Sequence, residues 1–201
     1  MQQVTANPLA SFLRAQAQTP PGRNRLAGVM QAPQEARARD NALAAEGGPT
    51  RAAAGRTDLA RGIMEAADEL GMDPVDLATI ISYETGGTFD PAQPGPTTKW
   101  GQHRGLIQFG EPQADRYGVD WSDPLGSQLG RRGAVVRYFR DRGYRPGMGL
   151  LDAYSIVNAG APGRYGASDE AAGGAPGTVR DKVNDQMGGH RRNALSLLGL
   201  G

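Results

Sequence analysis

Cysteine is absent from this 201-residue chain, and histidine is nearly so. Without cysteine the protein has no thiol nucleophile, no disulfide and no Cys-ligated zinc site. The two histidines, His103 and His190, are isolated and lack the spacing of metal ligands, so we expect both on the surface. The sequence also lacks a phosphate loop, a nucleophile elbow and a dinucleotide-binding fingerprint. These absences predict a protein that works without a metal or an organic cofactor.

Long apolar runs are missing as well. Hydrophobic residues make up 38% of the chain, and no stretch approaches the length of a membrane span. The first residues show no basic segment followed by an apolar one, so we expect a soluble protein without an ordinary secretory signal. Glycine, with 30 residues, and proline, with 14, are abundant. This composition is typical of a modest core that carries long loops or tails.

Residues 1–56 differ in composition from the rest of the chain. They are rich in Ala, Gln, Arg, Pro and Gly, and they hold seven arginines against three acidic residues, a net charge of +4. Because the whole chain carries +1, the remaining residues carry −3. A basic segment poor in apolar residues is expected to order only against a partner, such as an acidic protein surface, acidic lipid or nucleic acid. We therefore predict an extended N-terminal arm for docking over residues 1–56, with a solvated tail as the alternative.

Helix signals follow from residue 57 onward. Thr57 is a candidate N-cap for a helix that ends at Gly71, and Asp73 followed by Pro74 is a stronger signal for the start of a second helix. Apolar residues at helical spacing predict helices over residues 58–70, 74–84, 122–142, 150–159 and 179–198, the last interrupted at 188–189.

Between these helices, residues 85–104 and 160–177 have the composition of loops. The short apolar segment 105–110 indicates a strand or the start of a helix. The expected fold is therefore mainly α, with a minor irregular or β element. Six arginines within residues 131–145 predict a basic helix face, for which a solvated surface is the first interpretation and attraction to an anionic polymer or nucleic acid the second.

One carboxylic acid lies where an apolar residue is expected. Leu77, Ile80, Ile81 and Glu84 fall at i, i+3, i+4 and i+7, which is one face of the predicted second helix. Partial burial and the negative end of the helix dipole both disfavour the charged form of the acid, so the pKa of Glu84 should be raised. This residue has the properties of a general acid near neutral pH, and a helix-terminal Glu that turns toward water is the alternative.

The sequence contains three blocks in the order Gly71–Pro91, Gly105–Phe109 and Ala153–Gly160. In this order they resemble the blocks of the lysozyme-like catalytic domain of lytic transglycosylases of the soluble type, a family often found in phage virions. The resemblance covers about residues 57–160, half of the chain. Two positions depart from the family pattern: Thr85 replaces the usual Ser, and Tyr154 stands four residues before Asn158 instead of directly before it. Residues i and i+4 share a helix face, so this tyrosine can still face the same cleft.

The resemblance implies a peptidoglycan lytic transglycosylase with a lysozyme-like (α+β) domain over residues 57–160, on which a loop and C-terminal helix over 161–201 pack. In this family a single acid/base protonates the bond between N-acetylmuramic acid and N-acetylglucosamine. It then takes a proton from the muramyl 6-hydroxyl, which leaves a 1,6-anhydro product. On this resemblance Glu84 is the catalytic residue. The expected substrate-binding residues are Thr85, Gly105, Gln108, Tyr154 and Asn158.

The basic arm and the missing secretory signal favour a phage tail or ejection apparatus as the location. The expected partners are peptidoglycan and virion proteins, the latter contacted through residues 1–56. Three alternatives remain open. A second carboxylate at Asp90, Glu111 or Asp115 would indicate a hydrolysing muramidase, although Asp90 is expected to cap a turn and Glu111 to begin a helix. The other two are a free endolysin and a structural virion protein whose lysozyme-like domain has lost its activity.

Overall fold

The structure is a computed structural model that describes residues 51–201, apart from the side chains of residues 51 and 52. Most of the predicted arm, residues 1–50, lies outside this part. Residues 51–201 form one compact unit that is mainly helical, as the sequence predicts, and that contains one small antiparallel sheet. The elements in chain order are α3 (Arg51–Leu70), α4 (Pro74–Glu84), β1 (Pro94–Thr98), β2 (Gly101–Arg104), α5 (Glu111–Tyr117), α6 (Pro124–Gln128), α7 (Ala134–Asp141), α8 (Leu150–Ala159), η1 (Glu170–Ala172), α9 (Val179–Asp181), η2 (Lys182–Gln186) and α10 (Gly188–Leu198).

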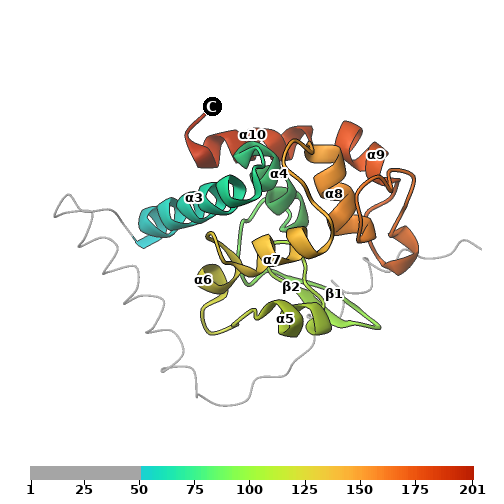
Figure 1. Ribbon diagram of the computed structural model, residues 1–201, viewed down its shortest axis with the longest axis horizontal. Coiled ribbons are helices and arrows are strands. Elements are labelled where there is room, and N and C mark those ends of the chain that lie inside the picture. The colour runs from blue at the N-terminus through green and yellow to red at the C-terminus, as the bar shows by residue number, and fades with distance from the viewer. Residues whose placement is uncertain (1–50) are drawn as a thin grey trace, which may run out of the picture. The chain divides into compact units, whose positions relative to one another are not determined.

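Helix α4 is the central element and has the predicted bounds. The Asp73 side chain accepts a hydrogen bond from the Val75 amide at 2.8 Å, and Pro74 occupies the first turn. The helix packs against α10, α3 and α8, so it is covered on several sides (Figure 1). Its residues from Leu77 to Ser82 are all buried, and Glu84 follows them at the last position of the helix, where the chain leaves the core.

The first helix begins earlier than predicted. Helix α3 starts at Arg51, and Thr57 lies inside it, where its hydroxyl donates to the Ala53 carbonyl at 3.0 Å. The proposed N-cap at Thr57 is therefore wrong. Residues 52–54 are all alanine, the strongest helix former, and they extend the helix past a threonine that bonds back onto its own backbone. The predicted domain boundary at residue 57 thus falls within α3.

A hairpin occupies part of the segment expected to be a loop. Strands β1 and β2 pair antiparallel, with Thr98 opposite Gly101 and Pro94 opposite Arg104. The prolines and glycine of β1 concealed the strand, because proline is tolerated where its missing amide lies on the outer edge of a sheet. The following segment, 105–110, is neither strand nor helix. It is a tight turn closed by the Arg104 amide, which donates to the Phe109 carbonyl at 2.9 Å.

The predicted single helix over 122–142 is two helices, α6 and α7. The chain turns between them at Gly130, which has a φ of 82°. A Cβ added at Gly133 would lie 2.4 Å from the carbonyl oxygens of Gln128 and Leu129, so this close approach requires glycine. The last predicted helix is also divided, into α9, the π-helical turn η2 and α10. Its break at Met187 lies next to the predicted interruption.

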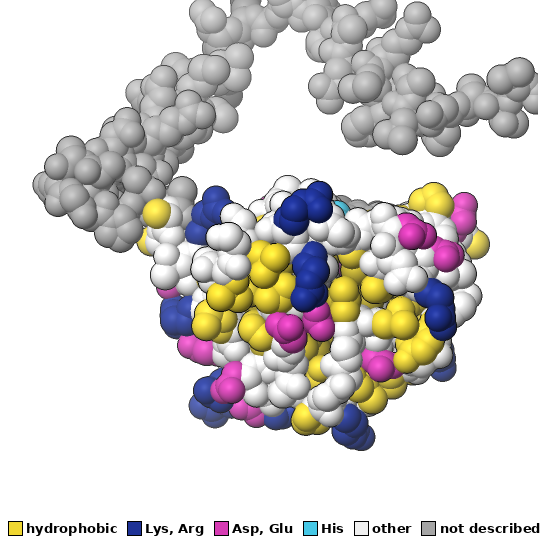
Figure 2. Space-filling view, turned by 90° about the horizontal axis from the view of Figure 1, so that it is seen from above, with side chains coloured by type: hydrophobic (Ala, Val, Ile, Leu, Met, Phe, Trp, Pro, Cys, Tyr) yellow, Lys and Arg dark blue, Asp and Glu magenta, His cyan; other side chains and the backbone are white. Residues whose placement is uncertain are grey.

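Two arginines, one from α7 and one from the preceding turn, contact acidic residues of α3. Arg131 lies 2.7 Å from Asp68, and Arg140 lies 2.5 Å from Glu69. All of these side chains are partly solvated, so each pair contributes little to stability. On the face shown in Figure 2, basic and acidic side chains are interspersed with hydrophobic ones. None of the helices within residues 51–201 combines the length and apolar character needed to span a membrane.

Gln128 is a buried polar residue that the sequence does not single out. Its side chain is fully buried and accepts a hydrogen bond from the Leu106 amide at 2.8 Å. The side-chain amide donates to the carbonyl oxygens of Pro91 and Pro124, both at 2.7 Å. One residue thus joins three segments, among them the turn that carries Gln108.

We expect Gln128→Leu to lower the free energy of unfolding by about 3 kcal/mol, because it leaves a buried amide and two carbonyl groups without partners. Urea denaturation followed by circular dichroism measures this change. Gln102→Leu is the matched control, since Gln102 is exposed and its side chain holds no other segment in place. An equal effect of both substitutions would contradict the role given to Gln128.

Candidate active site

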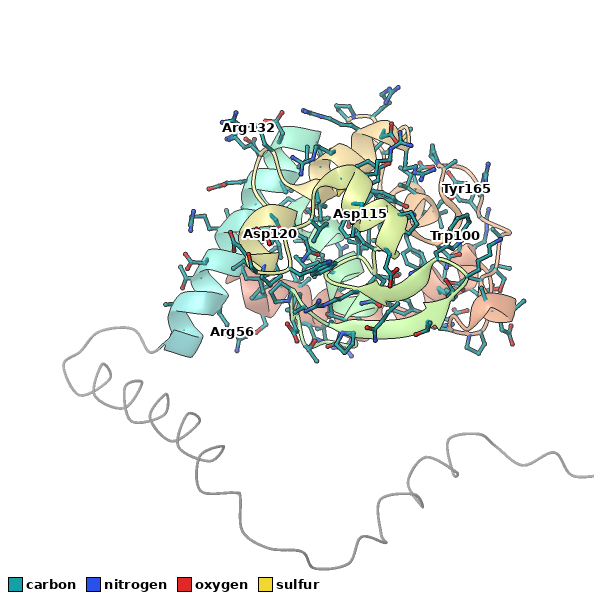
Figure 3. The ribbon with its side chains drawn as sticks, turned by 90° about the horizontal axis from the view of Figure 1, so that it is seen from below. Arg56, Trp100, Asp115, Asp120, Arg132 and Tyr165 are labelled. Carbon is teal, nitrogen blue, oxygen red and sulfur yellow. The ribbon has the colours of Figure 1, made fainter. Side chains whose placement is uncertain are left out.

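An open cleft of about 1120 Å³ contains the end of α4. Its walls are formed by the hairpin, α4, α8, the segment 169–175 and η2. Trp100, in the turn of the hairpin, is 55% exposed at the edge of this cleft (Figure 3). The lining includes Tyr83, Glu84, Thr85, Trp100, His103, Gln108, Tyr154, Asn158, Asp169, Lys182 and His190.

Glu84 follows the buried apolar face of α4 and emerges at the cleft wall. Burial is the main cause that raises the pKa of its carboxyl to about 8. The negative charge of Asp169 raises this pKa further, whereas the positive charge of Lys182 lowers it. The acid is therefore mostly protonated at neutral pH, as expected for a general acid. Burial is one of the two causes predicted from the sequence, and it follows from a carboxyl group on a helix face that turns toward the core.

Tyr154 lines the same cleft as Glu84 and lies within electrostatic reach of it. Its ring is buried and packs edge-to-face on Tyr83, with 5.5 Å between the ring centroids. Burial raises the pKa of Tyr154, and the charge of Glu84 raises it further, so the phenol stays a hydrogen-bond donor. Helix α8 presents Tyr154 and Asn158 one turn apart to the same cleft, which agrees with their i, i+4 spacing.

Asn158 is held with a defined orientation. Its Nδ2 donates to Asp169 Oδ2 at 2.7 Å. Its Oδ1 is buried and accepts no hydrogen bond from any residue between 51 and 201. Burying an acceptor without a donor is costly, so this oxygen is suited to an N–H or O–H group of a ligand in the cleft.

Gln108 lines the cleft and also supports the hairpin. Its backbone adopts a φ of 54°, and its side-chain amide donates to the carbonyls of Gly105 at 2.9 Å and Gln93 at 3.3 Å. Its Oε1 is buried without a donor among the described residues and lies against Gly95, where no side chain would fit. Two cleft residues, Asn158 and Gln108, thus carry buried acceptor oxygens that the described residues leave unsatisfied.

Thr85 and Gly105 both hold neighbouring turns in place, and of the two predicted substrate-binding residues Thr85 lines the cleft. The Thr85 hydroxyl donates to the Ile81 carbonyl at 2.7 Å and accepts from the Phe89 amide at 3.0 Å, so it holds the turn after α4. Gly105 does not line the cleft. It packs with a φ of 90° against the side chain of Gln128, a position that only glycine fills without strain.

The three carboxylates considered from the sequence lie outside the cleft. Asp90 accepts from the Ala92 amide at 2.8 Å and caps a turn, as expected. Glu111 begins α5, also as expected, and Asp115 is exposed on the same helix (Figure 3). The second carboxylate of the cleft is Asp169, which the sequence reasoning missed. It lies in a segment read as a loop, where no periodicity or motif distinguishes a functional residue from a solvated one.

Both histidines line the cleft, contrary to the expectation that they lie on the surface. The two ring nitrogens of His103 pair with the Gln108 carbonyl at 2.9 Å and the Thr98 hydroxyl at 3.0 Å. His190 pairs with the buried Ser82 hydroxyl at 2.9 Å, and burial lowers the pKa of its imidazole. Both rings bind neighbouring segments together at the cleft wall.

Comparisons with protein-family models, with curated proteins and with solved structures found no match to this chain. The features of the chain that bear on its function are therefore the geometry of the cleft and the three sequence blocks.

Proposed function

We propose that this protein is a peptidoglycan lytic transglycosylase with a lysozyme-like catalytic domain. The observation that carries this proposal is Glu84, a carboxylic acid with a pKa raised to about 8 in a cleft open enough for a glycan chain. Tyr154, Asn158 and Gln108, which come from different parts of the sequence, line the same cleft. An acid that keeps its proton at neutral pH is what cleavage of a glycosidic bond needs first.

In the proposed reaction Glu84 gives its proton to the oxygen between N-acetylmuramic acid and N-acetylglucosamine, and the bond from this oxygen to the muramyl C1 breaks. The acetamido group of the sugar stabilises the positive centre at C1. The Glu84 carboxylate then takes the proton of the muramyl 6-hydroxyl, whose oxygen bonds to C1. The product is a 1,6-anhydro sugar, and the enzyme returns to its protonated state without a water molecule.

A hydrolysing muramidase is the second candidate, because Asp169 supplies a further carboxylate in the cleft. Hydrolysis through an inverting route requires a carboxylate that activates water. Asp169 is less suited to this role, since one of its oxygens pairs with Lys182 and the other accepts from Asn158. The lone acid/base reaction is therefore the better supported of the two.

We further propose that the enzyme is carried in a phage virion, in the tail or the ejection apparatus, and opens the cell wall locally. The basic composition of residues 1–56 supports docking on a virion partner. Mass spectrometry of purified virions, compared with cleared lysate, tests this location. Presence in the lysate alone would favour a free endolysin.

Digestion of purified peptidoglycan, with mass spectrometry of the soluble fragments, tests the activity. We expect 1,6-anhydro muropeptides. Reducing ends would instead indicate hydrolysis, and no soluble fragment at all would favour the structural virion protein. Asp115→Asn is a matched control that should leave the products unchanged, because Asp115 is exposed outside the cleft.

A further inference from the structure

A buried cation lies in the cleft wall within electrostatic reach of Glu84. Lys182 belongs to η2, and its side chain is only 1% exposed. A buried ammonium group is costly unless it is paired, and its partner is Oδ1 of Asp169. The Asp169 side chain is 35% exposed and reaches the cleft from the segment between α8 and α9. The pair therefore joins two segments that are close in space at the site.

The other oxygen of Asp169 determines what Asn158 presents to the cleft. Since Nδ2 of Asn158 donates to Asp169 Oδ2 at 2.7 Å, the amide cannot turn over without losing this bond to a charged acceptor. Its Oδ1, buried and unsatisfied by the described residues, is thereby fixed as an acceptor in the cleft wall. A substrate that binds there must offer an N–H or O–H donor.

We propose that Asp169 is a positioning residue of this site: together with Lys182 it fixes the amide of Asn158 as an acceptor and sets the charge around Glu84. This role concerns the same site as the proposed transglycosylase activity, and it rests on that activity for the identity of the substrate. The two members of the pair act on Glu84 in opposite directions, because one is an anion and the other a cation. Opposite effects distinguish an electrostatic role from a purely structural one.

Among the described residues, three tyrosines are the other titratable groups coupled to Glu84. Tyr83 extends from the same helix, and Tyr154 from α8 and Tyr138 from α7 lie within electrostatic reach of it. Burial raises the pKa of each of these phenols, so they stay neutral across the pH range of interest. The remaining titratable residues of the cleft lining are Lys99, His103, Arg142 and His190.

The test is a titration of the Glu84 carboxyl by ¹³C NMR, with its signal assigned by its absence in Glu84→Gln. In the wild type we expect a midpoint near pH 8. Asp169→Asn should move the midpoint to lower pH, and Lys182→Met should move it to higher pH. The double variant should lie between the two single variants. Glu170→Gln is the matched control and should leave the midpoint in place, since Glu170 is exposed and does not line the cleft.

The activity of the same variants on peptidoglycan is measured as a function of pH. The fall of activity at high pH should follow the titration midpoint in each variant, since Glu84 must be protonated to act. Asp169→Asn should also raise the KM by about tenfold, because Asn158 loses its fixed orientation.

Two results would overturn the proposal: shifts of the midpoint in the same direction for both single variants, or no shift in either. Circular dichroism of each variant shows whether the fold is retained. If one single variant unfolds, its effect is measured as the difference in midpoint between the double variant, which buries no unpaired charge, and the other single variant. If the wild type releases no muropeptide, the proposed activity fails, and the titration still decides the electrostatic role of Asp169.

Discussion

Glu84→Gln is expected to reduce the release of anhydro-muropeptides by a factor of about 10² to 10⁴, the usual contribution of a general acid. Glutamine keeps the shape of the side chain but has no proton to give to the glycosidic oxygen. The neutral amide also resembles the protonated acid that burial favours, so the fold should be retained. The loss should appear in kcat, because Glu84 acts on the bond that breaks and contributes little to binding of the ground state.

The measurement is the initial rate of fragment release at pH 6 to 7, with mass spectrometry of the products. Glu111→Gln is the control, because it makes the same chemical change at an exposed residue outside the cleft. A Glu84→Gln enzyme that keeps more than about a tenth of the wild-type rate would contradict the role of Glu84 as the general acid. Asp169 would then be the first residue to examine, since it is the other carboxylate of the cleft.

The same substitution should stabilise the protein in alkaline solution. Burial raises the pKa of Glu84 from 4.5 to about 8. The folded protein therefore holds this proton more tightly than the unfolded chain does. The stabilisation from the bound proton is complete below about pH 4.5, declines as the pH rises, and is lost above about pH 8. Glutamine does not titrate, so the variant should lack this decline.

At pH 8 we expect Glu84→Gln to be more stable than the wild type by about 3 kcal/mol, and the two proteins to differ little near pH 4.5. This magnitude is smaller than a fully enclosed carboxyl would give, since the cleft admits water. Urea denaturation between pH 4.5 and 9 measures the difference. A constant difference at all pH values would show that Glu84 does not titrate in this range. Together, the two predictions describe a residue that favours catalysis at the expense of stability.

The sequence predicted those parts of the fold whose signals are local. The N-cap at Asp73, the proline after it and the apolar spacing up to Glu84 predicted α4 with its observed bounds. Helix α8 also has the predicted bounds, since an uninterrupted apolar pattern leads to Gly160 at its end. The hairpin and the division between α6 and α7 were missed. The prolines and glycine of β1 argued against a strand. The turn between α6 and α7 depends on the close approach at Gly133, which the apolar spacing does not show.

The site shows the same division. Helical periodicity by itself determined that Glu84 would lie at the edge of the core, because the spacing of 3.6 residues per turn fixes which side chains share a face. Only the tertiary structure decided which groups surround it. Asp169 and Lys182 reach Glu84 from a loop and a π-helical turn, and no local pattern marks either residue. Electrostatic effects on a buried acid depend on the distance between the charges in space. Asp169 and Lys182 follow Glu84 by 85 and 98 positions in the sequence, and these separations do not determine that distance.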